Sequence, residues 1–202
     1  MSGLRRVVLA SSNAGKLLEM RAILAGHPVE IVSQSDLGVS PAEEDGETFV
    51  ANALIKARHA ARLTGLPAIA DDSGLEVDAL AGRPGVHSAR YAGAGAGDAA
   101  NNALLLRELD GVTEAGRGAR YRCALVFVRD AADAAPVVRE ASWEGRIATA
   151  AGGSGGFGYD PLFIPAGEVR TVSELGAVAK NRVSHRGQAL RALAAAMRDV
   201  GW

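Results

Sequence analysis

The order of apolar and polar positions along the chain predicts strands and helices that alternate. Short apolar runs followed by polar loops are typical of buried strands, and apolar residues three or four apart are typical of helices with one buried face. We therefore expect strands at residues 7–10, 29–32, 68–70, 75–77, 121–128 and 137–143. We expect helices at residues 15–24, 48–63, 99–109 and 184–200. This order indicates an α/β fold in which helices flank a mixed, strongly twisted sheet.

Two glycine-rich stretches interrupt this pattern and are expected to be loops. They cover residues 79–98 and 151–161. Glycine adopts backbone conformations that other residues avoid, and it lets the backbone approach a ligand closely. The chain has no internal repeat and no low-complexity tail, so we expect residues 1–202 to form a single domain.

Composition narrows the possible partners. The chain has 202 residues, which is enough for a substantial core, and its net charge of −1 argues against a protein that coats nucleic acid. No apolar stretch is long enough to cross a membrane. The single cysteine, Cys123, lies in an apolar run and is expected to be buried rather than catalytic. We expect a cytoplasmic protein that binds neither nucleic acid nor membranes.

An acidic pair, Asp71 and Asp72, follows the apolar run at residues 68–70. We expect the pair to lie at the C-terminal end of a strand, with Ser73 and Gly74 turning the chain. Neighbouring carboxylates repel each other and are costly to bury, and a divalent cation would compensate for both effects. The alternative is that the pair only caps the turn.

The polar loop after the first predicted strand is a candidate anion site. Backbone N–H groups at the start of a helix attract anions, and a lysine adds a full charge. The loop lacks the glycine and hydroxyl positions of a Walker A motif. The alternative is that Ser12 or Asn13 caps the helix while Lys16 points into water. The candidate residues are Ser11, Ser12, Asn13, Ala14, Gly15 and Lys16.

A second acidic segment, residues 43–47, precedes the helix expected at residues 48–63. Magnesium usually takes one or two carboxylates, together with waters and phosphate oxygens of the substrate. One acid from this segment and one from the acidic pair would suffice. The alternative is a solvated loop whose charges favour the helix N-terminus.

The loop at residues 152–161 combines glycines with two aromatic residues, Phe157 and Tyr159. Either ring offers a face on which a nucleobase can stack. The alternatives are a flexible turn with a core aromatic, or a serine hydrolase with Ser154 in a Gly-x-Ser-x-Gly motif followed by Asp160 and His185. A nucleophile elbow needs a helix directly after the serine, and the glycines and proline here disfavour one.

The last predicted helix begins at Ser184, His185 and Arg186, shortly after Lys180. Ser184 is a good helix cap, but cations in a first turn oppose the helix dipole. This placement indicates either a ligand or an acidic partner. Together the candidate sites indicate an enzyme that handles a nucleoside triphosphate with magnesium. A non-catalytic nucleotide-binding module is the alternative, although it would not need the acidic residues.

Six motifs occur in order along the chain. They are Ser-x-Asn-x-Gly-Lys (residues 11–16), Glu-Glu-x-Gly-x-Thr-Phe (43–49), Ala-Asp-Asp-Ser-Gly-Leu (70–75), Ser-Ala-Arg-Tyr (88–91), Gly-Gly-Phe-Gly-Tyr-Asp-Pro (155–161) and Ser-His-Arg-Gly-x-Ala (184–189). Because it carries these six motifs in this order, the chain resembles the inosine/xanthosine triphosphate pyrophosphatase family.

The resemblance implies an activity and a shape. Members hydrolyse noncanonical purine nucleoside triphosphates (dITP, ITP, XTP) to the monophosphate and pyrophosphate, with Mg²⁺ assisting water attack on the α-phosphorus. They are homodimers of two-lobed subunits with the nucleotide in a central cleft. A related possibility is a pyrophosphatase for other modified nucleotides, including pyrimidines.

The resemblance also implies roles for single residues. Residues 11–16 match the triphosphate loop, and Ser12 replaces a glycine common among relatives. Glu43 and Asp72 match magnesium ligands, and Asp72 also matches the general base. Lys56 is expected near the phosphates. The other expected substrate contacts are Ser73, Phe157, Gly158, Tyr159, Asp160, Lys180, His185 and Arg186.

Overall fold

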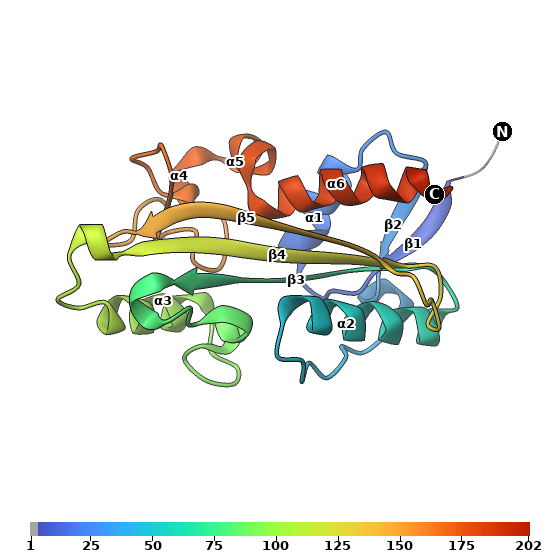
Figure 1. The fold of residues 1–202 in the computed structure, drawn as a ribbon, viewed down its shortest axis with the longest axis horizontal. Coiled ribbons are helices and arrows are strands. Elements are labelled where there is room, and N and C mark those ends of the chain that lie inside the picture. Colours follow the sequence, from blue (N-terminus) through green and yellow to red (C-terminus); the bar gives the residue numbers. More distant parts are fainter. Residues whose placement is uncertain (1–3) are drawn as a thin grey trace. The chain divides into compact units, whose positions relative to one another are not determined.

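The computed structural model describes residues 4–202 apart from the side chain of residue 177 (Figure 1). Residues 1–3 of the predicted domain lie outside the described residues. The strands are β1 (Arg5–Leu9), β2 (Val29–Ser33), β3 (Ala68–Val77), β4 (Gly118–Val128), β5 (Val137–Ile147) and β6 (Phe163–Pro165). The α-helices are α1 (Ala14–Ile23), α2 (Phe49–Thr64), α3 (Asp98–Glu108), α4 (Val172–Leu175), α5 (Ala177–Val183) and α6 (His185–Asp199).

The six strands form one sheet in the order β2-β1-β3-β4-β5-β6. β1 pairs in parallel with both β2 and β3, whereas β5 and β6 are antiparallel. The prediction of a mixed α/β sheet is therefore confirmed. No helix among residues 4–202 has both the length and the apolar character needed to cross a membrane.

The chain divides into two compact units. Unit 1 contains the described residues up to Asp72 together with residues 123–141 and 186–202, and unit 2 contains residues 73–122 and 142–185. The boundaries fall inside β3, β4 and β5 and just before Arg186. Each unit has a hydrophobic core of its own.

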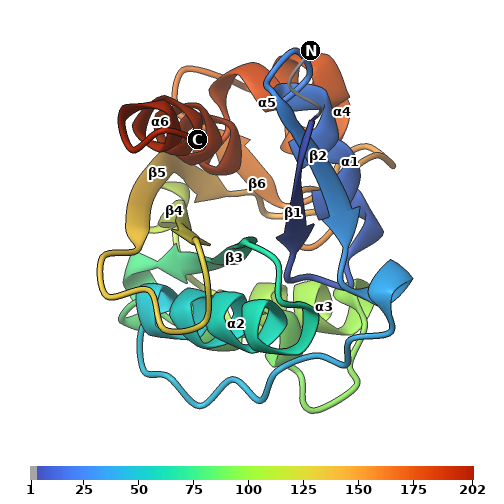
Figure 2. The ribbon, with the colours of Figure 1, turned by 90° about the vertical axis from the view of Figure 1, so that its right-hand side faces the viewer.

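In unit 1, helices cover both faces of the strands. Val7 and Leu9 of β1 pack in one core with Met20 of α1 and Leu193 of α6. Val8 is also fully buried but faces the other way, because neighbouring residues in a strand point to opposite faces. α2 contacts β1 and buries most of its alanines, and Figure 2 shows α2 and α6 on opposite sides of the strands.

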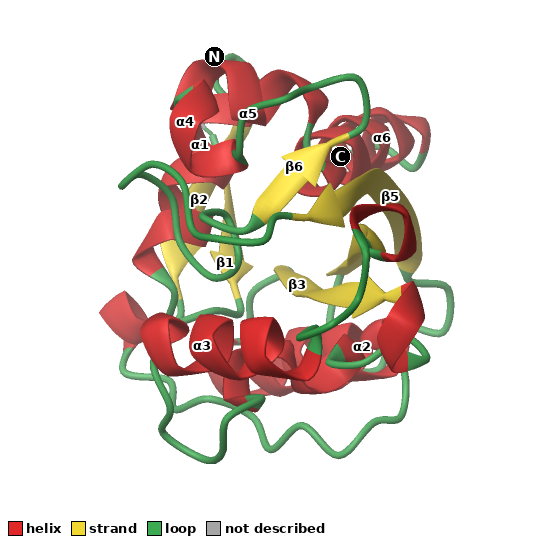
Figure 3. Ribbon diagram, turned by 90° about the vertical axis from the view of Figure 1, so that its left-hand side faces the viewer, coloured by secondary structure: helices red, strands yellow, loops and turns green. Residues whose placement is uncertain are grey.

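In unit 2, α3 packs along the strands. Leu105 and Leu109 share a core with Leu75 of β3, Tyr121 of β4 and Phe163 of β6. Figure 3 shows α3 running along one side of these strand segments. This core also receives Tyr159 and Leu162, so the end of the glycine-rich loop is anchored in the interior of unit 2.

Two features differ from the sequence-based expectation. Ser73 and Gly74 do not turn the chain, because β3 runs unbroken from Ala68 to Val77 and Gly74 is buried within it. The acidic pair therefore lies inside a strand rather than at its end. The loop at residues 79–98 also contains short 3₁₀ helices at Asp78–Leu80 and Gly85–Arg90.

Candidate active site

The loop between β1 and α1 is fixed by its own side chains. Asn13 caps α1, because its Oδ1 accepts the Lys16 N–H at 3.0 Å. Ser11 Oγ accepts the Asn13 N–H at 3.2 Å, and Ser12 Oγ accepts a hydrogen bond from Gln34 at 3.3 Å. The cap that we considered as an alternative is confirmed. It fixes the helix start at which backbone N–H groups can receive an anion.

Lys16 does not point into water. Its ammonium group is ion-paired with Asp71, whose side chain is fully buried. Asp71 Oδ2 also accepts from Arg186 Nε at 2.9 Å, and Arg186 Nη1 binds Glu19. Burial alone would raise the pKa of Asp71, but the charges of Arg186 and Lys16 hold this pKa well below its ordinary value. The carboxylate therefore stays ionised and keeps Lys16 in place.

Cys123 lies in the same buried cluster. Its thiol donates to Asp71 Oδ2 at 3.2 Å, and the side chain is buried. Burial and the nearby Asp71 carboxylate raise the pKa of the thiol well above its ordinary value. A thiol in this state is a poor nucleophile, in agreement with the predicted structural position.

Asp72 points to the opposite face of β3 and meets a different lysine. Lys56 of α2 donates to Asp72 Oδ1 at 2.7 Å and to Glu44 Oε2 at 3.0 Å. Asp72 Oδ2 is buried and has no hydrogen-bond partner among the described residues. Burial raises the pKa of Asp72 against the opposing charge of Lys56. One oxygen of this carboxylate is thus held, and the other is left to accept a proton or bind a cation.

The two acids of the pair therefore do not share one ion. Neighbouring residues in a strand face opposite ways, and each acid is neutralised by a lysine on its own face. Of the two neighbouring glutamates, Glu43 is exposed, whereas Glu44 is half-buried and joins Asp72 through Lys56. The sequence-based prediction singles out Glu43 and not Glu44, which stands directly beside it.

These donors fit a magnesium ion. No group of three or more His, Cys, Asp or Glu side chains suited to a metal occurs in the part of the chain that the structure describes. Magnesium seldom needs such a cage, because waters and substrate phosphates complete its shell around one or two carboxylates. A hard cation would satisfy the buried Oδ2 of Asp72.

A second constellation belongs to unit 2. Asp160 Oδ2 accepts from the Phe157 N–H at 3.1 Å and from Lys180 Nζ at 2.7 Å, while Tyr121 donates to Oδ1 at 3.3 Å. The Lys180 ammonium lies 4.2 Å from the centre of the Phe157 ring. The His185 ring is stacked on Tyr121, with ring centres 4.7 Å apart. These contacts bring four predicted residues together.

The two aromatics of the glycine-rich loop have different surroundings. Tyr159 is buried in the core of unit 2 and donates its hydroxyl to Ser88 O at 2.8 Å. Phe157 is only half-buried. Of the two rings, that of Phe157 is the more exposed, and Tyr159 is the core aromatic that we considered as the alternative.

The loop does not form a nucleophile elbow. Ser154 is exposed in a stretch without regular structure, and the next α-helix after it begins only at Val172. Asp160 is already bound to Lys180. The serine hydrolase hypothesis thus lacks the strand, turn and helix that its motif needs.

The remaining predicted residues belong to different units, with Ser73 and Gly158 in unit 2 and Arg186 in unit 1. Ser73 begins unit 2 and is half-buried, and Gly158 follows Phe157 in the loop. Arg186 opens the last segment of unit 1 and is buried against Asp71 and Glu19. Of the two explanations for this cation, the acidic partner is confirmed.

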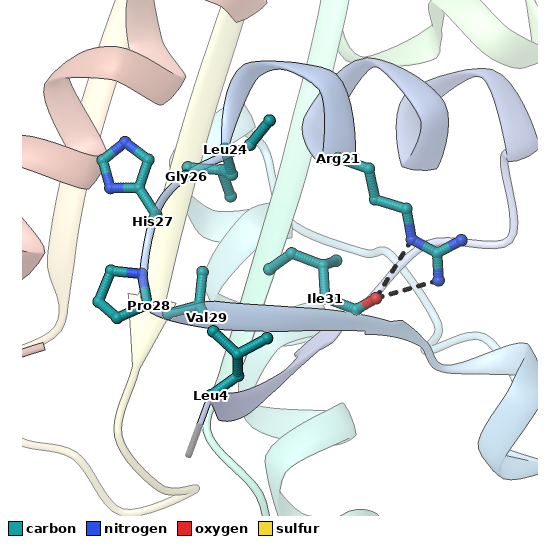
Figure 4. A pocket seen from close by; sticks show the side chains of 9 residues that line it. Leu4, Arg21, Leu24, Gly26, His27, Pro28, Val29 and Ile31 are labelled. Carbon is teal, nitrogen blue, oxygen red and sulfur yellow. Dashed lines mark hydrogen bonds between the residues drawn. The ribbon is translucent and has the colours of Figure 1, made fainter. Parts of the chain in front are cut away.

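A cavity of about 450 Å³ elsewhere in unit 1 contains none of these residues. Figure 4 shows it at the turn between α1 and β2, where Arg21 donates to Ile31 O at 3.0 and 3.3 Å. Its lining residues are Leu4, Arg21, Leu24, Ala25, Gly26, His27, Pro28, Val29 and Ile31.

The model of the Ham1 family matches residues 7–196 of this chain. The chain belongs to the Ham1 family. A family relative named dITP/XTP pyrophosphatase from Methylococcus capsulatus is 58% identical over 97% of this chain and 98% of its own length. A relative of the same name from Shigella flexneri is 52% identical over 97% of this chain and its entire length.

Solved Ham1 structures share the fold. The HAM1 protein of Coxiella burnetii superposes with a TM-score of 0.89 at 44% identity, covering 96% of this chain and 99% of that one. A Mycobacterium abscessus structure titled nucleoside-triphosphatase and dITP/XTP pyrophosphatase has a TM-score of 0.72 at 46% identity, covering 93% and 97%. The flanking helices and the mixed sheet therefore belong to the Ham1 fold.

Proposed function

We propose that this chain hydrolyses noncanonical purine nucleoside triphosphates (dITP, ITP, XTP) to the monophosphate and pyrophosphate, and so removes them from the nucleotide pool. One observation carries the proposal: Asp72 is a buried carboxylate with one oxygen held by Lys56 and the other without a hydrogen-bond partner among residues 4–202 as described. The names of the Methylococcus and Shigella relatives support the same substrates.

Each unit carries residues for one part of the substrate. In unit 1, Lys16 and the N–H groups at the start of α1 bind the triphosphate, because both present positive charge at a fixed place. In unit 2, Phe157 stacks on the base, and Lys180 and His185 contact it. An oxygen at purine position six accepts hydrogen bonds where the amino group of adenine donates them. Donors placed for the oxygen therefore disfavour adenine.

The reaction is a displacement at phosphorus. A water oxygen attacks the α-phosphorus, the bond from this phosphorus to the bridging oxygen breaks, and pyrophosphate leaves with that oxygen. Asp72 accepts the proton of the water. Lys56 holds Asp72 in place, and Lys16 stabilises negative charge on the phosphates.

Magnesium, when bound, neutralises part of the triphosphate charge and orients it. Asp72 Oδ2 and a glutamate of the acidic segment would hold the ion. The geometry favours Glu44, whereas the family resemblance favours Glu43.

Glutamine substitutions separate the two glutamates. If Glu44 is the ligand, Glu44→Gln raises the magnesium concentration for half-maximal turnover about tenfold or more, since even loss of a residue that only supports a metal ligand costs about 10- to 100-fold in affinity or activity. Glu43→Gln then leaves this magnesium concentration within about twofold, because Glu43 would contribute no charge-assisted contact to the ion. A metal titration of turnover checks this. The opposite ranking would return the metal to Glu43, and no effect of either would remove the acidic segment from the site.

Homodimerisation and a cytoplasmic location are also part of the proposal. The family resemblance supports the dimer, and the nucleotide pool that the enzyme would clean lies in the cytoplasm. Light scattering at several protein concentrations tests the dimer, and a concentration-independent monomer mass would exclude it.

Product analysis tests the function itself. The purified chain is incubated with magnesium and dITP, ITP or XTP, with dATP and dGTP as matched canonical nucleotides. We expect nucleoside monophosphate and pyrophosphate from the first three and much slower turnover of the last two. Release of single phosphate would contradict the assigned bond, and tight binding without turnover would indicate the non-catalytic module instead.

A further inference from the structure

Gly158 of the glycine-rich loop is held on both sides by α3. Its N–H donates to Asp98 Oδ2 at 2.6 Å, and its carbonyl accepts from Asn102 Nδ2 at 2.9 Å. Asp98 is the first residue of α3 and Asn102 follows one turn later, so both side chains lie on the same face of the helix. The helix thus binds both polar groups of one residue that lies far away in the sequence.

Gly158 needs this support because of its conformation. Its φ of 61° is left-handed, and a Cβ atom would meet nothing within 4 Å. The position therefore requires glycine for its backbone angles and not for lack of space. Glycine loses more conformational freedom on ordering than any other residue, so two hydrogen bonds on this one residue offset a particular cost here.

The bond from Asn102 is costly to make. Asn102 Oδ1 is buried and has no hydrogen-bond partner among the described residues. A buried acceptor without a partner is destabilising. In the neighbouring Asn101 both polar atoms have partners, because Oδ1 accepts from the Ala92 N–H and Nδ2 donates to Ala89 O. An unpaired amide oxygen is therefore not a general feature of this helix.

Gly158, which is held in this way, directly follows Phe157. The Phe157 N–H is bound by Asp160, and the next residue is bound by Asp98 and Asn102. The backbone on both sides of Phe157 is therefore held before a ligand arrives. A loop ordered in advance binds more tightly, because binding no longer has to order it.

We propose that Asp98 and Asn102 are positioning residues that fix the loop for the nucleoside part of the substrate. The inference rests on the proposed function, in which Phe157 stacks on the base. Neither side chain touches the substrate in this account. Their removal therefore weakens ligands that contain a nucleoside and leaves ligands without one unchanged.

Two inhibitors separate this effect from general damage. Hydrolysis of dITP is measured with dIMP or inorganic triphosphate as competitor, in the wild type and in Asp98→Ala and Asn102→Ala. We expect each variant to raise the inhibition constant of dIMP and the KM of dITP by about 3- to 10-fold, as loss of one hydrogen bond predicts. The inhibition constant of inorganic triphosphate and kcat should stay within about twofold.

Two further variants control the result. Asp98→Asn keeps an acceptor for the Gly158 N–H and should restore most of the dIMP affinity. Asn101→Ala removes side-chain hydrogen bonds of the same helix that do not involve residues 151–161. It should change neither inhibition constant.

The outcomes are distinct. Unchanged dIMP affinity, or equal weakening of both inhibitors, would overturn the positioning role. Absence of dITP turnover in the wild type would instead remove the proposed function, and the positioning role with it.

Discussion

Replacing Asp72 by asparagine should lower kcat for dITP by about 10²- to 10⁴-fold, the usual contribution of a general base. The amide is close to the carboxylate in shape, so Lys56 keeps an acceptor at Oδ1 and a second partner in Glu44. The amide cannot accept the proton of the attacking water. Steady-state turnover with saturating magnesium measures the effect.

A matched substitution shows that the effect is local. Asp36 is an exposed aspartate of the same unit, and Asp36→Asn should leave kcat unchanged. Urea unfolding of Asp72→Asn should show a cooperative transition, which separates lost chemistry from lost folding. Turnover of Asp72→Asn within threefold of the wild type would reject this residue as the base.

Replacing Lys16 by methionine should lower kcat/KM for dITP by about 10²- to 10³-fold, the usual effect of removing one preorganised donor from a developing charge. Methionine keeps most of the length of the side chain but removes the ammonium group. Asp71 remains paired with Arg186, so the buried carboxylate does not lose all compensation. Initial rates at low dITP concentration measure kcat/KM directly.

Arginine at the same position provides the matched comparison. Lys16→Arg keeps the charge and should retain a larger share of activity than Lys16→Met. Arg6→Gln removes an exposed cation from β1 that lies outside the phosphate loop and pairs with Glu30, and it should have no effect. Equal activity of Lys16→Met and the wild type would exclude Lys16 from phosphate binding.

Periodicity predicted the helices well because their buried faces repeat at regular spacing. The helix expected at residues 48–63 is α2 at Phe49–Thr64, and the one expected at 184–200 is α6 at His185–Asp199. α4 and α5 were missed, since helices of 4 and 7 residues are too short to show a repeat. Short elements of this kind depend on their tertiary surroundings more than on pattern.

The acidic pair shows where local reasoning failed. Ser73-Gly74 is a typical turn signal, but the buried strand partners of β3 outweighed it. Once the strand continues, its period of two places Asp71 and Asp72 on opposite faces, and the repulsion between them no longer calls for a shared cation. The choice between Glu43 and Glu44 had no comparable signal, because both lie in a loop without periodicity.

The contacts of α3 with the glycine-rich loop were also beyond sequence reasoning. Asp98 and Asn102 look like ordinary polar positions at the start of a helix. Their partner Gly158 stands 60 and 56 residues further along the chain. Only the folded chain brings these groups together, and their spacing of one helical turn has meaning only once that partner is known.

The most direct test of the account is hydrolysis of dITP in water labelled with a heavy oxygen isotope, followed by mass spectrometry of both products. Attack on the α-phosphorus predicts one heavy oxygen in dIMP and none in pyrophosphate. Heavy oxygen in the pyrophosphate would mean that water attacks the β-phosphorus, and it would contradict the reaction assigned to Asp72.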